Sequence, residues 1–158
     1  MEFNILCGIP GSGKSTLVSL LPGYVVSTDR IRKFLWQDES IVKHDALVFS
    51  LVDSILNYML KKKENVVLDA TNLTKKTRKH YIKLGKKYQA TVILHWIECP
   101  LDLALTRNFQ RERRVPEEVI LSLYHSFQEP HITEGMDLIK IYDINLEIKN
   151  TIAGQKEI

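Results

Sequence analysis

The sequence predicts an α/β fold in which a mainly parallel sheet of about five strands is flanked by helices on both faces. Short apolar runs of strand length alternate with segments of helical periodicity along the 158 residues. In addition, a glycine-rich turn joins the first apolar run to the first helical segment. Strands that alternate with helices form βαβ units with right-handed crossovers, which build a parallel sheet. We expect one domain, residues 1–158, because this length suits a single hydrophobic core.

Each element follows from its own pattern. The expected strands are the apolar runs at residues 3–7, 24–27, 65–70, 90–98 and 138–144. The expected helices are residues 15–21, which Pro22 and Gly23 would end, and residues 30–37, 41–62, 74–87, 101–111 and 116–128. The polar segment from Lys149 onward is expected to be frayed. Because parallel strands end at the same edge of a sheet, we expect the ligand site beyond their carboxyl ends.

The charge and cysteine content restrict the class of protein. Net charge is +3, but the stretch from Lys61 to Lys87 contains ten basic and two acidic residues and carries +8. Such a stretch fits either a nucleic-acid partner or a solvated helix face. Cys7 and Cys99 lie in apolar runs without metal-ligand spacing, as in reduced cytoplasmic proteins. No apolar run is long enough to span a bilayer and no signal peptide precedes the first strand, so we expect no membrane association, and no protein partner is evident.

Residues 8–16, GIPGSGKST, fit the phosphate-loop pattern G-x-x-x-x-G-K-[ST] between an expected strand and an expected helix. Glycines let the backbone wrap closely around an anion, and its N–H groups then bind phosphate oxygens. In this pattern Lys14 reaches the β- and γ-phosphates and Ser15 binds Mg²⁺. ATP and Mg²⁺ are therefore the expected cofactors. The expected nucleotide-binding residues in this segment are Gly8, Gly11, Ser12, Gly13, Lys14, Ser15 and Thr16.

Asp29 follows the second expected strand and lies in the first turn of the next helix. A carboxylate there could accept the proton of an attacking hydroxyl during phosphoryl transfer. It could equally stabilise the start of the helix through the helix dipole, and the local pattern does not separate the two roles. Arg32 lies three residues on, on the same helix face. It could bind an anionic group of the acceptor, or point into solvent.

Asp69 ends the third expected strand, VVLD, where a carboxylate near the metal is common in phosphate-loop proteins. We expect it to contact Mg²⁺ through water. The alternative is that Asp69 caps the turn formed with Thr71 and Asn72. These two residues could themselves line the acceptor site, although turn chemistry explains them nearly as well.

A cluster of arginines follows the fourth strand. On a continuous helix the spacing of Arg107, Arg111 and Arg114 would place three guanidinium groups on one face. This predicts an arginine-bearing helical lid that closes over the phosphates of ATP. The alternative is a solvated helix that neighbouring glutamates partly neutralise.

Four segments together resemble the kinase domain of the polynucleotide 5′-kinases of bacteriophage and bacterial end-healing enzymes. The segments are GIPGSGKST, STDRIR, VVLDATN followed by a helix with Arg78, and RNFQRERRVPEEVI, and the resemblance runs to about Phe127. It implies a P-loop kinase fold in which Asp29 is the general base and Arg32 holds the phosphate of the terminal nucleotide. It also implies Arg111 as the catalytic lid arginine, with Arg78 among the substrate-binding residues.

Two departures leave the acceptor and the lid arginine open. The lid is about one residue shorter before Val115 than in that family, so Arg113 and Arg114 compete with Arg111 for the catalytic role. The segment FQEPHITEGMD resembles a wider group of small P-loop kinases, including seryl-tRNA kinases and toxin-like sugar-nucleotide kinases. The leading hypothesis is a kinase of 5′-hydroxyl DNA or RNA ends in nucleic acid repair. The alternatives are a kinase of a small molecule, sugar nucleotide or aminoacyl-tRNA, and an ATP-binding switch without an acceptor.

Overall fold

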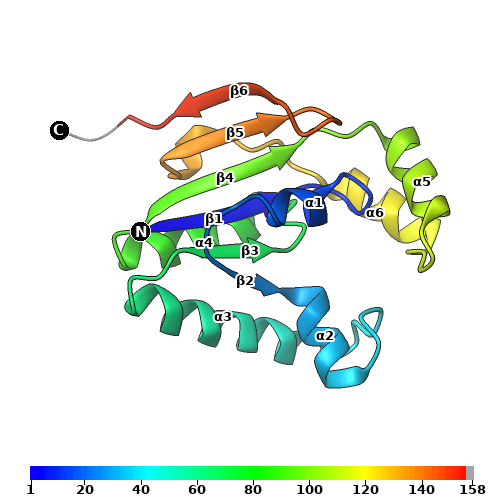
Figure 1. The fold of residues 1–158 in the computed structure, drawn as a ribbon, viewed down its shortest axis with the longest axis horizontal. Helices are drawn as coiled ribbons and strands as arrows, with labels where there is room; N and C mark the ends of the chain where they lie inside the picture. The colour runs from blue at the N-terminus through cyan, green and yellow to red at the C-terminus, as the bar shows by residue number, and fades with distance from the viewer. Residues whose placement is uncertain (156–158) are drawn as a thin grey trace.

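A six-stranded sheet forms the centre of the protein, and its strand order is β2-β3-β1-β4-β5-β6 (Figure 1). This computed structural model describes residues 1–155. The strands are β1 (Glu2–Cys7), β2 (Tyr24–Ser27), β3 (Val66–Asp69), β4 (Thr91–Ile97), β5 (Leu138–Tyr142) and β6 (Ile148–Ala153). The first five are parallel and β6 is antiparallel to β5, so the expected mainly parallel α/β sheet is confirmed.

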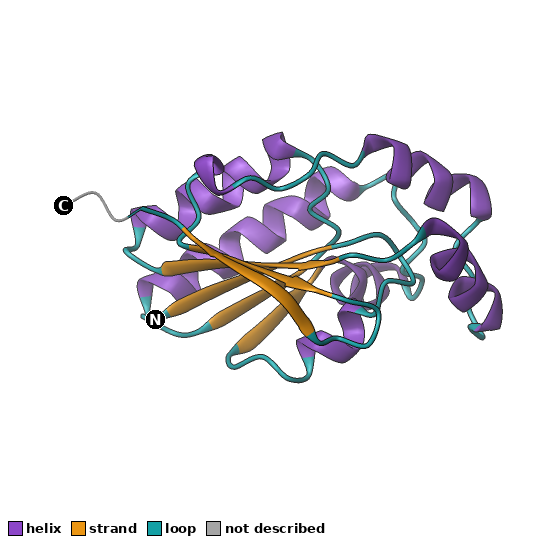
Figure 2. Cartoon of the chain, turned by 90° about the horizontal axis from the view of Figure 1, so that it is seen from above, coloured by secondary structure: helices purple, strands orange, loops and turns teal. Residues whose placement is uncertain are grey.

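Helices cover both faces of the sheet, as Figure 2 shows from above. They are α1 (Lys14–Val18), α2 (Thr28–Trp36), α3 (Asp45–Lys61), α4 (Lys75–Lys87), α5 (Leu101–Gln110) and α6 (Glu117–Ser126), with a 3-10 turn η1 (Ile132–Glu134). Alternate residues of β1 face opposite sides: Phe3 and Ile5 pack in the core that α3 and α4 cover, and Leu6 packs under α1. Helices α5 and α6 lie beyond the carboxyl ends of the strands (Figure 1).

The expectation of a frayed segment from Lys149 onward was wrong for residues 149–153, because Ile148–Ala153 forms the edge strand β6, and residues 156–158 lie outside the described residues. Ile152 pairs with Ile139 and packs against the larger core, while most other side chains of β6 are exposed. An edge strand with one covered face carries few apolar residues, so its pattern resembles that of a loop. The sheet therefore has one strand more than expected.

A chain of buried polar side chains crosses the middle of the sheet. His95 of β4 is 1% exposed, and its ring nitrogens lie 2.7 Å from Asn4 Oδ1 and 2.8 Å from the Tyr142 hydroxyl. A neutral imidazole satisfies both partners when Nε2–H donates to Asn4 and Nδ1 accepts from Tyr142. Burial, together with the positive charge of Lys140, lowers the pKa of His95 from 6.5 to about 4. His95 is therefore a structural residue of the sheet rather than a metal ligand.

Candidate active site

The phosphate loop connects β1 to α1 and has room only for glycine at two positions. Gly11 has φ +86°, and a Cβ there would lie 2.6 Å from the carbonyl oxygen of Ala104 in α5. A Cβ on Gly8 would lie 2.7 Å from Ser12 Oγ, which is buried. Gly13, with φ +103°, precedes the first residue of α1. These close approaches give the loop the tight curvature that a phosphate-binding backbone needs.

Three charged residues that the sequence singled out act electrostatically on Lys14. Its Nζ donates to the carbonyl oxygen of Ile9 at 2.9 Å. Burial lowers the pKa of Lys14 from 10.5 to about 8, the negative charges of Asp69 and Asp29 oppose this shift, and the positive charge of Arg111 adds to it. The shift identifies Asp69, Asp29 and Arg111 as groups within electrostatic range of Lys14. The ends of β1, β2 and β3 and the segment after α5 thus meet at one place.

Asp29 lies in the first turn of α2, and its side chain is 69% exposed. The cap of α2 is Ser27, whose Oγ accepts from the backbone N–H of Arg30 at 3.4 Å. Ser27 therefore supplies the side-chain cap of α2, and Asp29 does not. Its Oδ1 accepts from Arg32 Nη1 at 2.7 Å, and the exposed remainder of the carboxylate is accessible to an acceptor.

Arg32 does not point into solvent, which was one of the two interpretations of its position in the sequence. It is 9% exposed, and a bidentate pair with Asp45 binds it from the other side, with Nε–Oδ1 at 2.8 Å and Nη2–Oδ2 at 2.9 Å. Arg32 therefore uses three of its five N–H groups within residues 1–155 and joins the start of α2 to the start of α3.

The residues present fit a magnesium ion of the phosphate-loop type. Ser15 supplies an exposed hydroxyl in α1, and Asp69 ends β3. By strand alternation Asp69 lies on the same face as Val67, which packs under α1. Magnesium in such sites is bound by one or two protein oxygens, and substrate phosphates and water complete the shell. Within residues 1–155 no group of three acidic, histidine or cysteine side chains forms an all-protein metal site.

The expected lid is only partly helical. Helix α5 ends at Gln110, and Arg111 has an extended backbone with ψ 144°. Residues 111–114 form an irregular segment, which we call the lid segment. The expectation that Arg107, Arg111 and Arg114 share one helical face was therefore wrong: four arginines in close succession repel one another on a helix, and the chain leaves the helix before the last three.

The arginines of this region have separate contacts. Arg107 reaches across the phosphate loop, where Nη1 lies 3.4 Å from the carbonyl oxygens of Gly11 and Ser12, and Nη2 donates to that of Ile144 at 3.1 Å. Arg113 forms ion pairs with Asp38 and Glu39 in the loop between α2 and α3.

Arg114 lies 4.0 Å from the centre of the Phe109 ring, a cation–π contact. Arg111 is exposed and has no ion pair among the described residues, yet its charge acts on Lys14. Of the three arginines of the lid segment, Arg111 has the placement that suits contact with a phosphate.

Two residues expected in the acceptor site are structural instead. Arg78 is completely buried, where it pairs with Glu134 and donates from Nη1 to the carbonyl oxygens of Asn72 and Leu73. Asn72 is 2% exposed, has φ +47°, and donates from Nδ2 to the carbonyl oxygen of Leu6 at 2.7 Å. We therefore withdraw Arg78 and Asn72 from the substrate-binding set. Thr71 stays at the rim, where its carbonyl oxygen accepts from Gly8 N–H at 3.1 Å.

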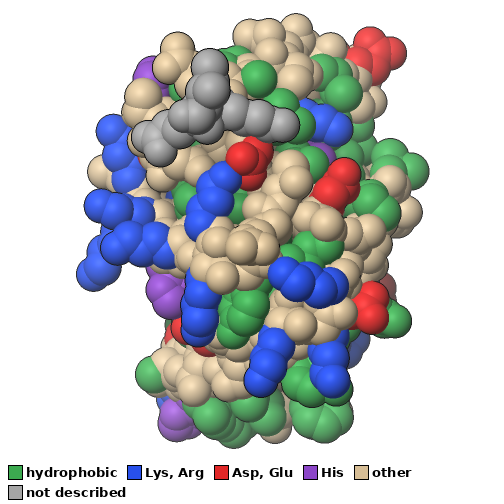
Figure 3. Space-filling model, turned by 90° about the vertical axis from the view of Figure 1, so that its left-hand side faces the viewer, with side chains coloured by type: hydrophobic (Ala, Val, Ile, Leu, Met, Phe, Trp, Pro, Cys, Tyr) green, Lys and Arg blue, Asp and Glu red, His purple; other side chains and the backbone are tan. Residues whose placement is uncertain are grey.

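The basic stretch from Lys61 to Lys87 lies along α4 and at the end of α3. Nine of its ten basic side chains are exposed, and Arg78 is the exception. Helix α4 begins at the rim of the site with Lys75 and ends with Lys87 at the opposite end of the molecule. Figure 3 looks at that opposite end, where Lys and Arg side chains are prominent. The stretch thus forms a basic surface that runs away from the site.

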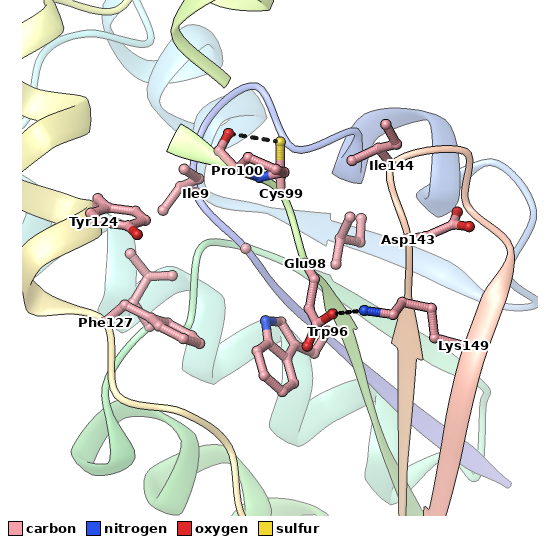
Figure 4. A pocket seen from close by; sticks show the side chains of 13 residues that line it. Ile9, Trp96, Glu98, Cys99, Pro100, Tyr124, Phe127, Asp143, Ile144 and Lys149 are labelled. Carbon is pink, nitrogen blue, oxygen red and sulfur yellow. Dashed lines mark hydrogen bonds and ion pairs between the residues drawn. The ribbon is translucent and has the colours of Figure 1, made fainter. Parts of the chain in front are cut away.

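A cavity of about 560 Å³ borders the phosphate loop, because Gly8 and Ile9 are among the residues that line it (Figure 4). Its walls include Trp96, Tyr124 and Phe127, and the ion pair of Glu98 with Lys149 lies at one side. None of Lys14, Asp29 and Asp69 lines it. The cavity therefore does not include the place where phosphoryl transfer would occur.

Comparison with known families gives a match along most of the chain. Residues 4–130 match the family model described as an AAA domain. The chain belongs to this AAA domain family. The matched range includes the phosphate loop, Asp29, Asp69 and the lid segment. Separately, within residues 1–155 no helix is long and apolar enough to cross a membrane.

Two curated relatives of the domain are kinases. The L-seryl-tRNA(Sec) kinase of Methanococcus maripaludis is 26% identical over 145 residues, which is 85% of this chain and 55% of that protein. The bifunctional polynucleotide phosphatase/kinase of Schizosaccharomyces pombe is 27% identical over 142 residues, 85% of this chain and 31% of that protein. The chain thus spans about half, or less, of the length of the relatives it matches.

Among solved structures, a chain of the Pnkp1/Rnl/Hen1 RNA repair complex shares the fold with a TM-score of 0.70 at 22% identity, covering 79% of this chain and 43% of that one. The two curated relatives are named as kinases, and this solved structure shares the fold, so the expected P-loop kinase type of domain is confirmed. The comparisons leave the acceptor open, since one relative is named for seryl-tRNA(Sec) and the other for polynucleotides.

The sequence did not reveal Asp45 or the Asp38–Glu39 pair as parts of the site. Asp45 occupies the first turn of α3, where an acidic residue is expected on helix-dipole grounds alone. Asp38 and Glu39 lie in a polar loop, where acidic residues are common. Only the folded arrangement pairs them with Arg32 and Arg113.

Proposed function

We propose that the domain transfers the γ-phosphate of ATP to the 5′-hydroxyl end of DNA or RNA. The observation that supports this most is the exposed Asp29 carboxylate at the end of β2, within electrostatic range of Lys14 in the phosphate loop. A base beside a phosphate site, open to solvent, suits activation of an acceptor hydroxyl.

In this proposal each residue has one task. The loop from Gly8 to Thr16 binds the phosphates through backbone N–H groups, and Lys14 holds the β- and γ-phosphates. Ser15 directly and Asp69 through water would hold Mg²⁺, which would neutralise charge on the phosphates. Asp29 accepts the proton of the acceptor hydroxyl, whose oxygen forms the new bond to the γ-phosphorus while the bond to the β-phosphate oxygen breaks and ADP leaves. Arg111 stabilises the charge that develops on the transferred group.

Two features favour a polynucleotide acceptor. The two N–H groups that Arg32 does not use within residues 1–155 can donate to an anionic oxygen of the terminal nucleotide. The lysines along α4 offer a path for the phosphates that follow, since neutralising them releases counterions. The similarity to a polynucleotide phosphatase/kinase agrees with this acceptor.

The second candidate is an aminoacyl-tRNA kinase, because the seryl-tRNA(Sec) kinase relative matches the same share of the chain. Such an acceptor is also a polyanion and would suit the same basic surface. The two candidates differ in the hydroxyl that is phosphorylated.

An acceptor panel tests the proposal. The protein is incubated with γ-labelled ATP and Mg²⁺ together with 5′-hydroxyl DNA, 5′-hydroxyl RNA, the same oligonucleotides already 5′-phosphorylated, seryl-tRNA and sugar nucleotides. We expect labelling of the 5′-hydroxyl oligonucleotides only. Labelling of seryl-tRNA or a sugar nucleotide instead would reject the polynucleotide acceptor.

The Asp29→Asn variant tests phosphoryl transfer against an ATP-binding switch. Loss of the base should lower transfer by about 10² to 10⁴-fold while ATP still binds. Asp53→Asn is the matched control, since Asp53 is a carboxylate on α3 paired with His80 away from the site. Equal activity of Asp29→Asn and the wild type would rule out this mechanism.

A further inference from the structure

Asp45 is the most constrained carboxylate near the site and has no assigned role. Both of its oxygens accept from Arg32, at 2.8 Å from Nε and 2.9 Å from Nη2. Its side chain is 29% exposed, whereas that of Asp29 is 69% exposed. Asp45 therefore faces the guanidinium, while most of the Asp29 side chain faces solvent.

A bidentate pair fixes the plane of a guanidinium group, which a single hydrogen bond does not. Once Asp45 holds Nε and Nη2, the direction of Nη1 is set, and Nη1 donates to Asp29 Oδ1 at 2.7 Å. The carboxylate of Asp29 is thus held in place from α3, a different helix from its own. The buried Arg32 guanidinium thus restricts the rotamer of the exposed Asp29 side chain.

The charges of the cluster support a role beyond joining two helices. One guanidinium is shared by two carboxylates, so the attraction of Arg32 is divided between Asp29 and Asp45. Without Asp45, Arg32 would be a buried cation whose single partner is Asp29. Arg32 would then bind the Asp29 carboxylate more strongly and make Asp29 a weaker base. Asp29 also acts electrostatically on Lys14 of α1, as do Asp69 of β3 and Arg111 of the lid segment.

We propose that Asp45 is a positioning residue for phosphoryl transfer, which acts through Arg32 to hold and partly screen the base Asp29. The proposal rests on the proposed function for the identity of the base. In this role Asp45 does not contact the reacting atoms. Its effect on the reaction passes entirely through the guanidinium of Arg32.

A double-mutant cycle tests this route. The wild type, Asp45→Asn, Arg32→Met and the double variant are compared for kcat, for KM of ATP and of the acceptor, and for melting temperature. Asp45→Asn should lower kcat by at least about tenfold, since small displacements of reacting groups are costly, and should leave KM for ATP unchanged. In the Arg32→Met background the same change should alter kcat by less than about twofold, because the route through Arg32 is already absent.

Asp53→Asn again serves as the control, because Asp53 lies on the same helix and pairs with a residue of another element, His80 Nε2, at 3.0 Å. It should leave kcat unchanged. Asp45→Glu keeps a carboxylate for Arg32 and should recover kcat relative to Asp45→Asn, which also covers the case that the asparagine variant does not fold. The proposal is overturned if Asp45→Asn lowers kcat equally with and without Arg32, if it has no effect, or if Asp45→Glu recovers nothing.

The acceptor for the cycle is the one that the panel identifies for the wild type. If the wild type labels seryl-tRNA rather than a 5′-hydroxyl end, the proposed function fails, and the cycle on seryl-tRNA still decides the role of Asp45. If the wild type labels the oligonucleotide and the cycle is additive, the positioning role fails alone.

Discussion

Arg78 and Glu134 form a buried bidentate ion pair, in which Nε donates to Oε2 and Nη2 donates to Oε1 at 2.8 Å each. The pair joins α4 to the turn η1, and Glu134 Oε1 also accepts from the backbone N–H of His131. Since Arg78 Nη1 binds two carbonyl oxygens of the turn after β3, this pair holds the segment that carries Thr71 beside the phosphate loop.

The Arg78→Met variant should lower the free energy of unfolding by about 3 to 5 kcal/mol, because it leaves the Glu134 carboxylate buried without its partner. Denaturant titration measures the change. Lys79→Met, on an exposed neighbouring position, should change stability by less than about 0.5 kcal/mol. If Arg78→Met is as stable as Lys79→Met but loses acceptor binding, Arg78 contacts substrate after all.

ATP binding should weaken above pH 8, because burial lowers the pKa of Lys14 to about 8 and only the charged ammonium attracts phosphate. Above that pH, binding must take up a proton, so Kd should rise by at most about tenfold per pH unit. Calorimetric titration between pH 6.5 and 9.5 measures this. In Lys14→Arg the guanidinium stays charged throughout, so the slope should disappear even if affinity is lower. A slope that persists in Lys14→Arg would assign it to another group.

Among the arginines of the lid segment, Arg111→Ala should lower kcat the most, on the order of 10³-fold, since Arg111 is the one not engaged by another side chain in residues 1–155. Arg113→Ala and Arg114→Ala should each cost less than about tenfold, because exposed pairs and cation–π contacts contribute little. Single-turnover rates with saturating ATP separate the three variants. A larger loss from Arg113→Ala would mean that its pair with Asp38 and Glu39 opens during turnover.

His95 should make the protein less stable as pH falls. The pKa of His95 is about 4 in the folded state and 6.5 in the unfolded chain, so the unfolded chain binds the proton first as pH falls. The free energy of unfolding should therefore decrease between pH 6.5 and pH 4, by up to on the order of 3 kcal/mol.

Denaturant titrations across that range test this, with His125→Gln, an exposed position, as the control. His95→Gln should be less stable at neutral pH and should lose most of the slope. An unchanged slope in His95→Gln would show that the carboxylates alone cause it.

The parallel core and the phosphate loop could be predicted from sequence because they depend on local pattern. Strand β2 was expected at its observed bounds, and α5 was misplaced by a single residue at its end. What the pattern could not supply is pairing across long separations. Arg78 lies on a lysine-rich helix and reads as a surface residue, and its partner lies 56 residues away. Asp45 likewise became part of the site only when α3 was placed beside α2.

The close approach of Gly11 to Ala104 gives the phosphate loop and α5 a shared backbone contact with no side chain between them. Arg107 adds a second tie on the same helix, three residues later. Any shift of α5 that moves Arg111 toward the γ-phosphate should therefore also displace the backbone N–H groups of the loop that bind the same nucleotide. Nucleotide binding by the phosphate loop and closure of the lid segment would therefore be coupled. A ligand that changes the conformation of the loop should change the rate of protease cleavage within residues 111–114.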